Sequence, residues 1–100
     1  MLVNYVAMDL ETTGLNPRMD KIIEIGAVKI ENGVVKDTFC TYVNPGKGIP
    51  QRIMDLTGIT NEDVANAPYI EEILPQFLEF LGEDYLLGHN IIFDYSFIKK

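Results

Sequence analysis

Two acidic side chains, Asp9 and Glu11, stand two residues apart at the end of an apolar run. Residues two apart on a strand project from the same face, so the two carboxylates would lie side by side. Residues 5–8 (Tyr-Val-Ala-Met) are apolar on both faces, as in a covered central strand. Two like charges there are costly unless a cation, usually a divalent metal ion, lies between them. The simpler alternative is a strand end that meets solvent, but the apolar run and the following Thr-Thr-Gly favour a site.

A third carboxylate, Asp94, falls in the first turn of a helix that we expect Asn90 to cap. Acidic residues at helix N-termini stabilise the helix by up to about 1 kcal/mol, which is the alternative role of Asp94. Ligand sites in α/β proteins, however, lie at the carboxyl ends of strands. If the strands that precede Asp9 and Asp94 are parallel neighbours, their ends bring these acids together.

Two other polar residues have plainer interpretations. His89 is the only histidine of the chain. At a strand end before Asn90, a structural or substrate-positioning role is favoured over that of a general base. Glu24 lies in an apolar strand, where an unpaired carboxylate would be costly to bury. We expect it to be a structural carboxylate that faces a lysine or a helix N-terminus.

Composition limits the class of protein. The 100 residues are 47% hydrophobic, which predicts one domain with a packed core. The formal charge of −7 will not attract a nucleic acid unless bound cations reverse the local sign. Cys40 is the only cysteine, which fits a reducing, cytoplasmic setting without disulfides. No apolar stretch approaches the length of a membrane span, so we expect no membrane partner.

The hydrophobic periods predict an α/β fold with a mixed sheet. Strands are expected over residues 3–10, 21–31, 34–43 and 85–89, with an Asn-Gly hairpin turn at 32–33. Helices are expected from Pro50 to Gly58, after a capping box at 60–63, over 68–81, and from Asn90 onward. The apolar side chains assigned to helix faces or the core include Ile53, Met54, Leu56, Ile70, Ile73, Leu74, Phe77, Leu78, Phe80, Leu81, Phe93 and Phe97. The first three strands would form an antiparallel meander.

The combination of motifs resembles the DEDD-type 3′–5′ exonucleases of the ribonuclease H-like superfamily. It is most similar to the proofreading (epsilon) subunits of DNA polymerase III and to the exonuclease domains of Gram-positive polymerases and helicases. The matching stretches, in family order, are residues 9–15 (Asp-Leu-Glu-Thr-Thr-Gly-Leu), 22–28 (Ile-Ile-Glu-Ile-Gly-Ala-Val), 56–59 (Leu-Thr-Gly-Ile) and 89–94 (His-Asn-Ile-Ile-Phe-Asp). The order of four motifs is far more specific than any one of them.

The resemblance implies a ribonuclease H-like mixed sheet and a set of roles. Asp9, Glu11 and Asp94 would be three of four acidic ligands of two Mg²⁺ or Mn²⁺ ions. The backbone around Thr12, Thr13 and Gly14 would hold the 3′-terminal nucleotide, with Ile59 near its base and Asn90 on the same strand. The implied partners are a single-stranded 3′ end of DNA, with RNA as an alternative, and a DNA polymerase or helicase.

The third motif of the family, a His or Tyr followed by a fourth Asp, has no match in the chain. It would lie beyond residue 100, so residues 1–100 would be the N-terminal portion of one exonuclease domain, with its C-terminal part missing. The mismatch leaves an alternative open, namely a non-catalytic nucleic-acid or metal-binding module of the same fold.

Overall fold

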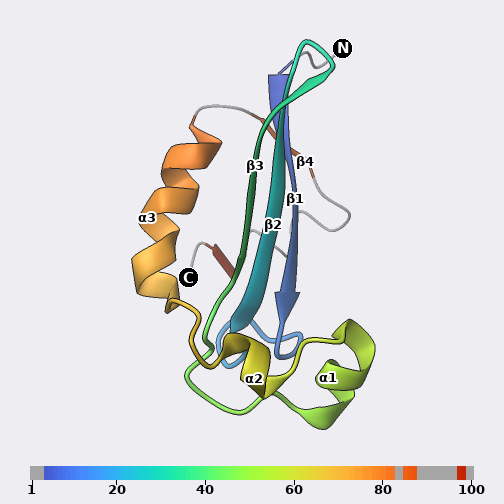
Figure 1. Cartoon of the computed structure of the whole chain (residues 1–100), viewed down its shortest axis with the longest axis vertical. Helices are drawn as coiled ribbons and strands as arrows, with labels where there is room; N and C mark the ends of the chain where they lie inside the picture. Colours follow the sequence, from blue (N-terminus) through green and yellow to red (C-terminus); the bar gives the residue numbers. More distant parts are fainter. Residues whose placement is uncertain (1–3, 83–84, 88–96, 99–100) are drawn as a thin grey trace.

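The computed structural model describes residues 4–82, 85–87 and 97–98. They form a four-stranded sheet in the order β3-β2-β1-β4 with helices at one face and one end (Figure 1). The strands are β1 (Asn4–Thr12), β2 (Ile22–Glu31), β3 (Val34–Tyr42) and β4 (Tyr85–Leu87). β1, β2 and β3 pair antiparallel and β4 pairs parallel with β1, which confirms the predicted meander and mixed sheet.

A tight hairpin joins β2 to β3. Asn32 and Gly33 both have positive φ, 52° and 78°, at the tip of this hairpin. Two such residues match the right-handed twist of the strands, and Asn and Gly adopt that conformation at the least cost. The Asn-Gly turn read from the sequence is therefore confirmed.

Three helices follow the meander. They are α1 (Gln51–Thr57), α2 (Asn61–Val64) and α3 (Ile70–Leu81). α1 ends at Gly58, whose φ of 78° suits glycine. α2 begins with the predicted capping box, in which Thr60 Oγ1 accepts from Asp63 N and Thr60 N donates to Asp63 Oδ2. α1 and α3 begin one and two residues later than expected, because Pro50 and Tyr69 are their N-caps.

The main core lies between one face of the sheet and α3, which runs along it in Figure 1. Ile73, Phe77 and Leu81 recur every four residues and are buried against alternate β1 residues. Phe77 is fully buried, with its ring centroid 5.3 Å from that of Phe39. The core residues are Val6, Met8, Leu10, Ile22, Ile25, Ala27, Val43, Ile73, Phe77, Leu81 and Phe97.

A second core anchors α1 and α2 at the end of the sheet. It consists of Ile23, Ile49, Ile53, Ile59 and Val64, with Met54 packed against it. Leu56 and Leu78 are 80% and 50% exposed, so their assignment to buried helix faces was wrong. The buried positions belong to Ile53, three residues before Leu56, and to Phe77, next to Leu78. Phe93 lies outside the described residues.

β1 differs from the expected strand in two ways. It extends beyond residue 10, because Glu11 still pairs with Glu24 and the register shifts only at Thr12. Its two faces are also unequal: Val6 and Met8 are buried, whereas Ala7 is half-buried and Asp9 is exposed. The expectation that β1 is covered on both faces therefore fails for the part of the chain that the structure describes. Within that part, no helix is long and apolar enough to cross a membrane.

The core assignment can be tested with two adjacent positions of α3. Phe77→Ala removes a fully buried ring and should lower the free energy of unfolding by about 3–5 kcal/mol. Leu78→Ala, on the half-exposed side, should lower it by less than about 1 kcal/mol. Urea titrations of both variants measure the difference, and equal losses would contradict the orientation of α3.

Candidate active site

Asp9 and Glu11 lie side by side on the sheet face opposite the main core. On the neighbouring strand Asp9 pairs with Gly26 and Glu11 pairs with Glu24. Gly26 has no side chain, so β2 leaves the space next to Asp9 open. Asp9 is exposed and Glu11 is half-buried, which leaves both carboxylates accessible from one side.

Glu11 is held in a negative environment. Burial is the main cause that raises the pKa of Glu11, and the nearby charges of Asp9 and Glu24 raise it further. Glu24 thus lies across the β1–β2 pair from Glu11, and within the described part of the chain it makes no ion pair with a lysine within 4 Å. This neighbour of Glu24 is set by the β1–β2 register, which the sequence of β2 alone does not specify. A cation beside Asp9 and Glu11 would relieve this repulsion.

The acidic pair fits a hard divalent metal ion. Carboxylate oxygens are the ligands that Mg²⁺ and Mn²⁺ prefer. Within residues 4–82, 85–87 and 97–98, no group of three or more His, Cys, Asp or Glu side chains is close enough to hold a metal ion. Asp94, His89 and Asn90 lie outside the described residues. The structure therefore brings together two of the three predicted metal ligands, Asp9 and Glu11, and does not test the third.

Residues 12–14 form a tightly held loop directly after the acidic pair. Thr12 Oγ1 donates to Gly14 O at 2.7 Å. Thr13 Oγ1 donates to Asp20 Oδ1 at 3.2 Å and accepts from Lys21 N at 2.9 Å. Thr12, Thr13 and Gly14 are all buried. The hydroxyl groups of Thr12 and Thr13 are thus used to fix the loop.

Asp20 is the side chain that closes this loop. It accepts from Asn16 N at 2.9 Å as well as from Thr13 Oγ1. The Asn16 hydrogen bond is the main cause that lowers the pKa of Asp20 below its usual range, with smaller contributions from Thr13 and the charges of Lys47 and Arg52. The carboxylate form is therefore the one that the loop requires.

A cavity of about 340 Å³ opens between this loop and α1. Its lining residues are Leu10, Glu11, Thr12, Gly14, Leu15, Arg52, Ile53, Leu56 and Thr57. Leu15 on the loop and Leu56 on α1 are 79% and 80% exposed, so the cavity has two apolar side chains open to solvent. Glu11 of the acidic pair and Thr12 and Gly14 of the predicted nucleotide-binding loop all line it, so the cavity lies next to both.

Ile59 is not part of this cavity. It is 4% exposed and lies in the second core behind α1. Leu15 and Leu56 are instead the large apolar residues exposed in the cavity, and the sequence reasoning missed both. A signal was available, because each belongs to a matched motif, Leu15 as its last residue and Leu56 as its first.

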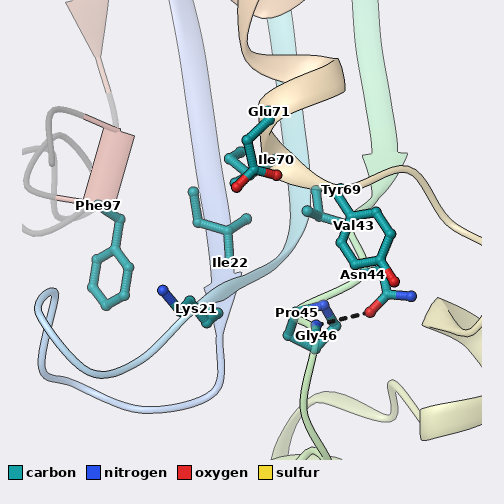
Figure 2. A pocket seen from close by; sticks show the side chains of 10 residues that line it. All are labelled: Lys21, Ile22, Val43, Asn44, Pro45, Gly46, Tyr69, Ile70, Glu71 and Phe97. Atoms are coloured by element: carbon teal, nitrogen blue, oxygen red, sulfur yellow. Dashed lines mark hydrogen bonds between the residues drawn. The ribbon is translucent and has the colours of Figure 1, made fainter.

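A second cavity, of about 240 Å³, lies between the start of β2 and the start of α3 (Figure 2). Figure 2 shows Lys21 and Phe97 on one side of it and Asn44 and Tyr69 on the other. Asn44 Oδ1 accepts from Gly46 N at 2.8 Å. Among the residues that the structure describes, neither the acidic pair Asp9 and Glu11 nor a glycine of the matched motifs lines this cavity, so the candidate site is placed at the first cavity.

Comparison with known proteins decides the family. The model of the RNase T-type exonuclease family matches residues 6–100. The chain belongs to this exonuclease family. It is 51% identical over 96 residues to the PolC-type DNA polymerase III of Clostridium perfringens, covering 96% of the chain and 7% of that protein. It is 45% identical over 96 residues to the DNA polymerase III epsilon subunit of Aquifex aeolicus, covering 96% of the chain and 48% of that protein.

Solved structures confirm the fold of this exonuclease-family chain. Exonuclease X, solved in complex with a 5′-overhanging duplex DNA, superposes with a TM-score of 0.79 at 29% identity and covers 92% of this chain and 52% of that one. Exonuclease I without ligand superposes with a TM-score of 0.84 over 99% of this chain and 24% of that one, at 18% identity. The predicted α/β, ribonuclease H-like fold class is confirmed. The chain spans about half or less of the length of these proteins.

The loop geometry can be tested by a double-mutant cycle at Gly14 and Asp20. An added Cβ at Gly14 would lie within 2.8 Å of Asp20 Oδ1, so Gly14→Ala must displace the carboxylate that holds Thr13 and Asn16. We expect Gly14→Ala to cost about 1–3 kcal/mol of unfolding free energy in the wild type and clearly less in an Asp20→Ala background. Gly48→Ala, which meets no atom within 4 Å, is the control. Additive effects at 14 and 20, measured by chemical denaturation, would contradict the contact.

Proposed function

We propose that residues 1–100 are the N-terminal portion of a metal-dependent 3′–5′ exonuclease domain that removes nucleoside 5′-monophosphates from the 3′ ends of DNA. The observation that carries the proposal is the paired placement of Asp9 and Glu11 on one sheet face, with Glu11 at the edge of an open cavity. Membership of the exonuclease family supports the reaction class. The polymerase names of the relatives support DNA as the substrate.

The acidic residues are assigned to metal binding. Asp9 and Glu11, together with Asp94, would hold Mg²⁺ or Mn²⁺, two ions in a complete site. Such ions, when bound, lower the pKa of a water molecule and stabilise the charge of the leaving 3′-oxygen. Burial is the main cause that raises the pKa of Glu11, and the charges of Asp9 and Glu24 add a smaller repulsion, which a bound cation would relieve. We expect the general base and the fourth acid in a part of the protein beyond residue 100.

The cavity beside Glu11 is assigned to the terminal nucleotide. The backbone of Thr12 and Gly14 would contact the sugar, and the base would lie between Leu15 and Leu56. The rigid hydrogen-bonded loop and the exposure of both leucines support this placement. Ile59 would act from behind by holding α1 in place, and Asn90 remains a candidate contact to the same strand.

The proposed setting is cytoplasmic DNA replication. The relatives are polymerase III proteins, so we expect this domain to be part of a DNA polymerase or helicase, or to bind one. Degradation of matched DNA and RNA oligonucleotides distinguishes a DNA exonuclease from an RNA-directed one. A faster rate on RNA would contradict DNA as the substrate.

The metal ligands can be tested in the full-length protein. Asp9→Asn and Asp94→Asn should each lower kcat at least about 1,000-fold, because several kcal/mol of transition-state stabilisation is lost. Asp37→Asn on the exposed strand β3 makes the same change away from the site and should leave kcat unchanged. Near-wild-type, magnesium-dependent hydrolysis by either site variant would refute the assignment.

Metal binding itself can be measured without turnover. Mn²⁺ at about 100 times its dissociation constant should stabilise the wild-type fold by about 2.7 kcal/mol, because it binds only the folded site. Asp9→Asn should lose most of this gain, and Asp37→Asn should keep it. Thermal unfolding with Mn²⁺ or with EDTA gives the values. An equal gain in all three proteins would show that the ion binds elsewhere.

A further inference from the structure

α1 presents a cation to the cavity beside the acidic pair. Arg52 and Leu56 are four residues apart, so they lie on the same side of the helix, and both line the cavity. Ile53, next to Arg52, is 6% exposed and lies in the second core, which fixes the rotation of α1. Among the described residues that line the cavity, Arg52 is the only cationic one.

The guanidinium of Arg52 makes no hydrogen bond or ion pair with the other described side chains of α1. Its helix neighbour Asp55 accepts instead from Gln51 Nε2 at 2.9 Å. Within residues 4–82, 85–87 and 97–98, Arg52 makes no hydrogen bond and no ion pair within 4 Å, and its charge acts only at longer range on Asp20. An arginine held in this way keeps its donors available to a ligand.

The geometry points to Arg52 as a residue that binds a backbone phosphate of the DNA strand in the cavity, an inference that rests on the proposed exonuclease function. The chain has a net charge of −7, and Asp9, Glu11 and Glu24 add a negative field near the cavity. A phosphodiester strand entering there needs a positive group on the protein as well as any bound metal. Arginine fits phosphate oxygens with two parallel N–H donors.

Arg52 is assigned to strand binding rather than to the chemical step. The acidic pair is on β1, whereas Arg52 is on α1 across the cavity. A phosphate bound at Arg52 would hold the strand against Leu15 and Leu56 in the ground state and the transition state alike. Loss of Arg52 should therefore raise KM with little change in kcat.

The test compares four full-length proteins: the wild type, Arg52→Gln, Arg52→Lys and Arg18→Gln. Arg18 is exposed, lines a different cavity and gives the same change in net charge, so it is the matched control. Hydrolysis of a single-stranded oligonucleotide with Mg²⁺ is measured between 50 and 200 mM salt. Binding of a phosphorothioate oligonucleotide that resists hydrolysis is titrated over the same range.

Arg52→Gln should raise KM and the dissociation constant about tenfold, with kcat within about twofold of the wild type. The slope of log binding constant against log salt should become shallower by about 0.7, the value for one phosphate contact on a single strand. Arg52→Lys should keep the wild-type slope because the charge remains, with a smaller rise in KM. Arg18→Gln should match the wild type.

Two results would overturn the inference: an Arg52→Gln protein with the KM, affinity and salt slope of Arg18→Gln, or one that loses kcat while its affinity is unchanged. Failure of the proposed function is a separate result, since a wild type that binds the oligonucleotide without degrading its 3′ end refutes the exonuclease. The binding titrations still decide the role of Arg52 in that case.

Discussion

The repulsion between carboxylates on one face of β1 is the constraint on which the rest of the site depends. Asp9 and Glu11 share that face by strand geometry, and the register of β2 adds Glu24 beside them. Burial raises the pKa of Glu11, and the charges of Asp9 and Glu24 raise it further. The packing of the sheet must offset this repulsion. The buried alternate residues of β1, which face the main core, supply that packing. The same strand thus supplies a packed core on one side and concentrated negative charge on the other.

The loop after β1 and the helix α1 form a defined cavity next to these carboxylates. The loop over residues 12–14 is closed by Asp20, so hydrogen bonds hold the backbone after Glu11. α1 is fixed by Ile53 in the second core and faces the loop across the cavity. Arg52 and Leu56 therefore reach the cavity from a rigid helix. Among the described residues, the cavity is lined by the acidic Glu11, the apolar pair Leu15 and Leu56, and the cation Arg52, a set of groups that would suit the terminal nucleotide and phosphates that we propose.

Local signals in the sequence predicted most of the fold. Asn32-Gly33, the Thr60–Asp63 capping box and Gly58 each act through their own backbone conformation, so they could be read without knowledge of tertiary structure. The acidic pair could be read in the same way, because its geometry depends on β1 alone. Leu56 and Glu24 could not, since their environments depend on how α1 and β2 meet the rest of the chain. Ile59 shows the same limit: its motif was matched, but packing placed it in the core and left the cavity to Leu56.

The most direct measurement is the polarity and product of hydrolysis by the full-length protein. A single-stranded DNA labelled at either end is incubated with Mg²⁺ or Mn²⁺, and the products are resolved with time. We predict that the 3′ label leaves first as a nucleoside 5′-monophosphate, that the 5′-labelled strand shortens stepwise, and that EDTA stops both. First release of the 5′ label, internal cleavage, or no metal-dependent degradation would contradict the proposed function.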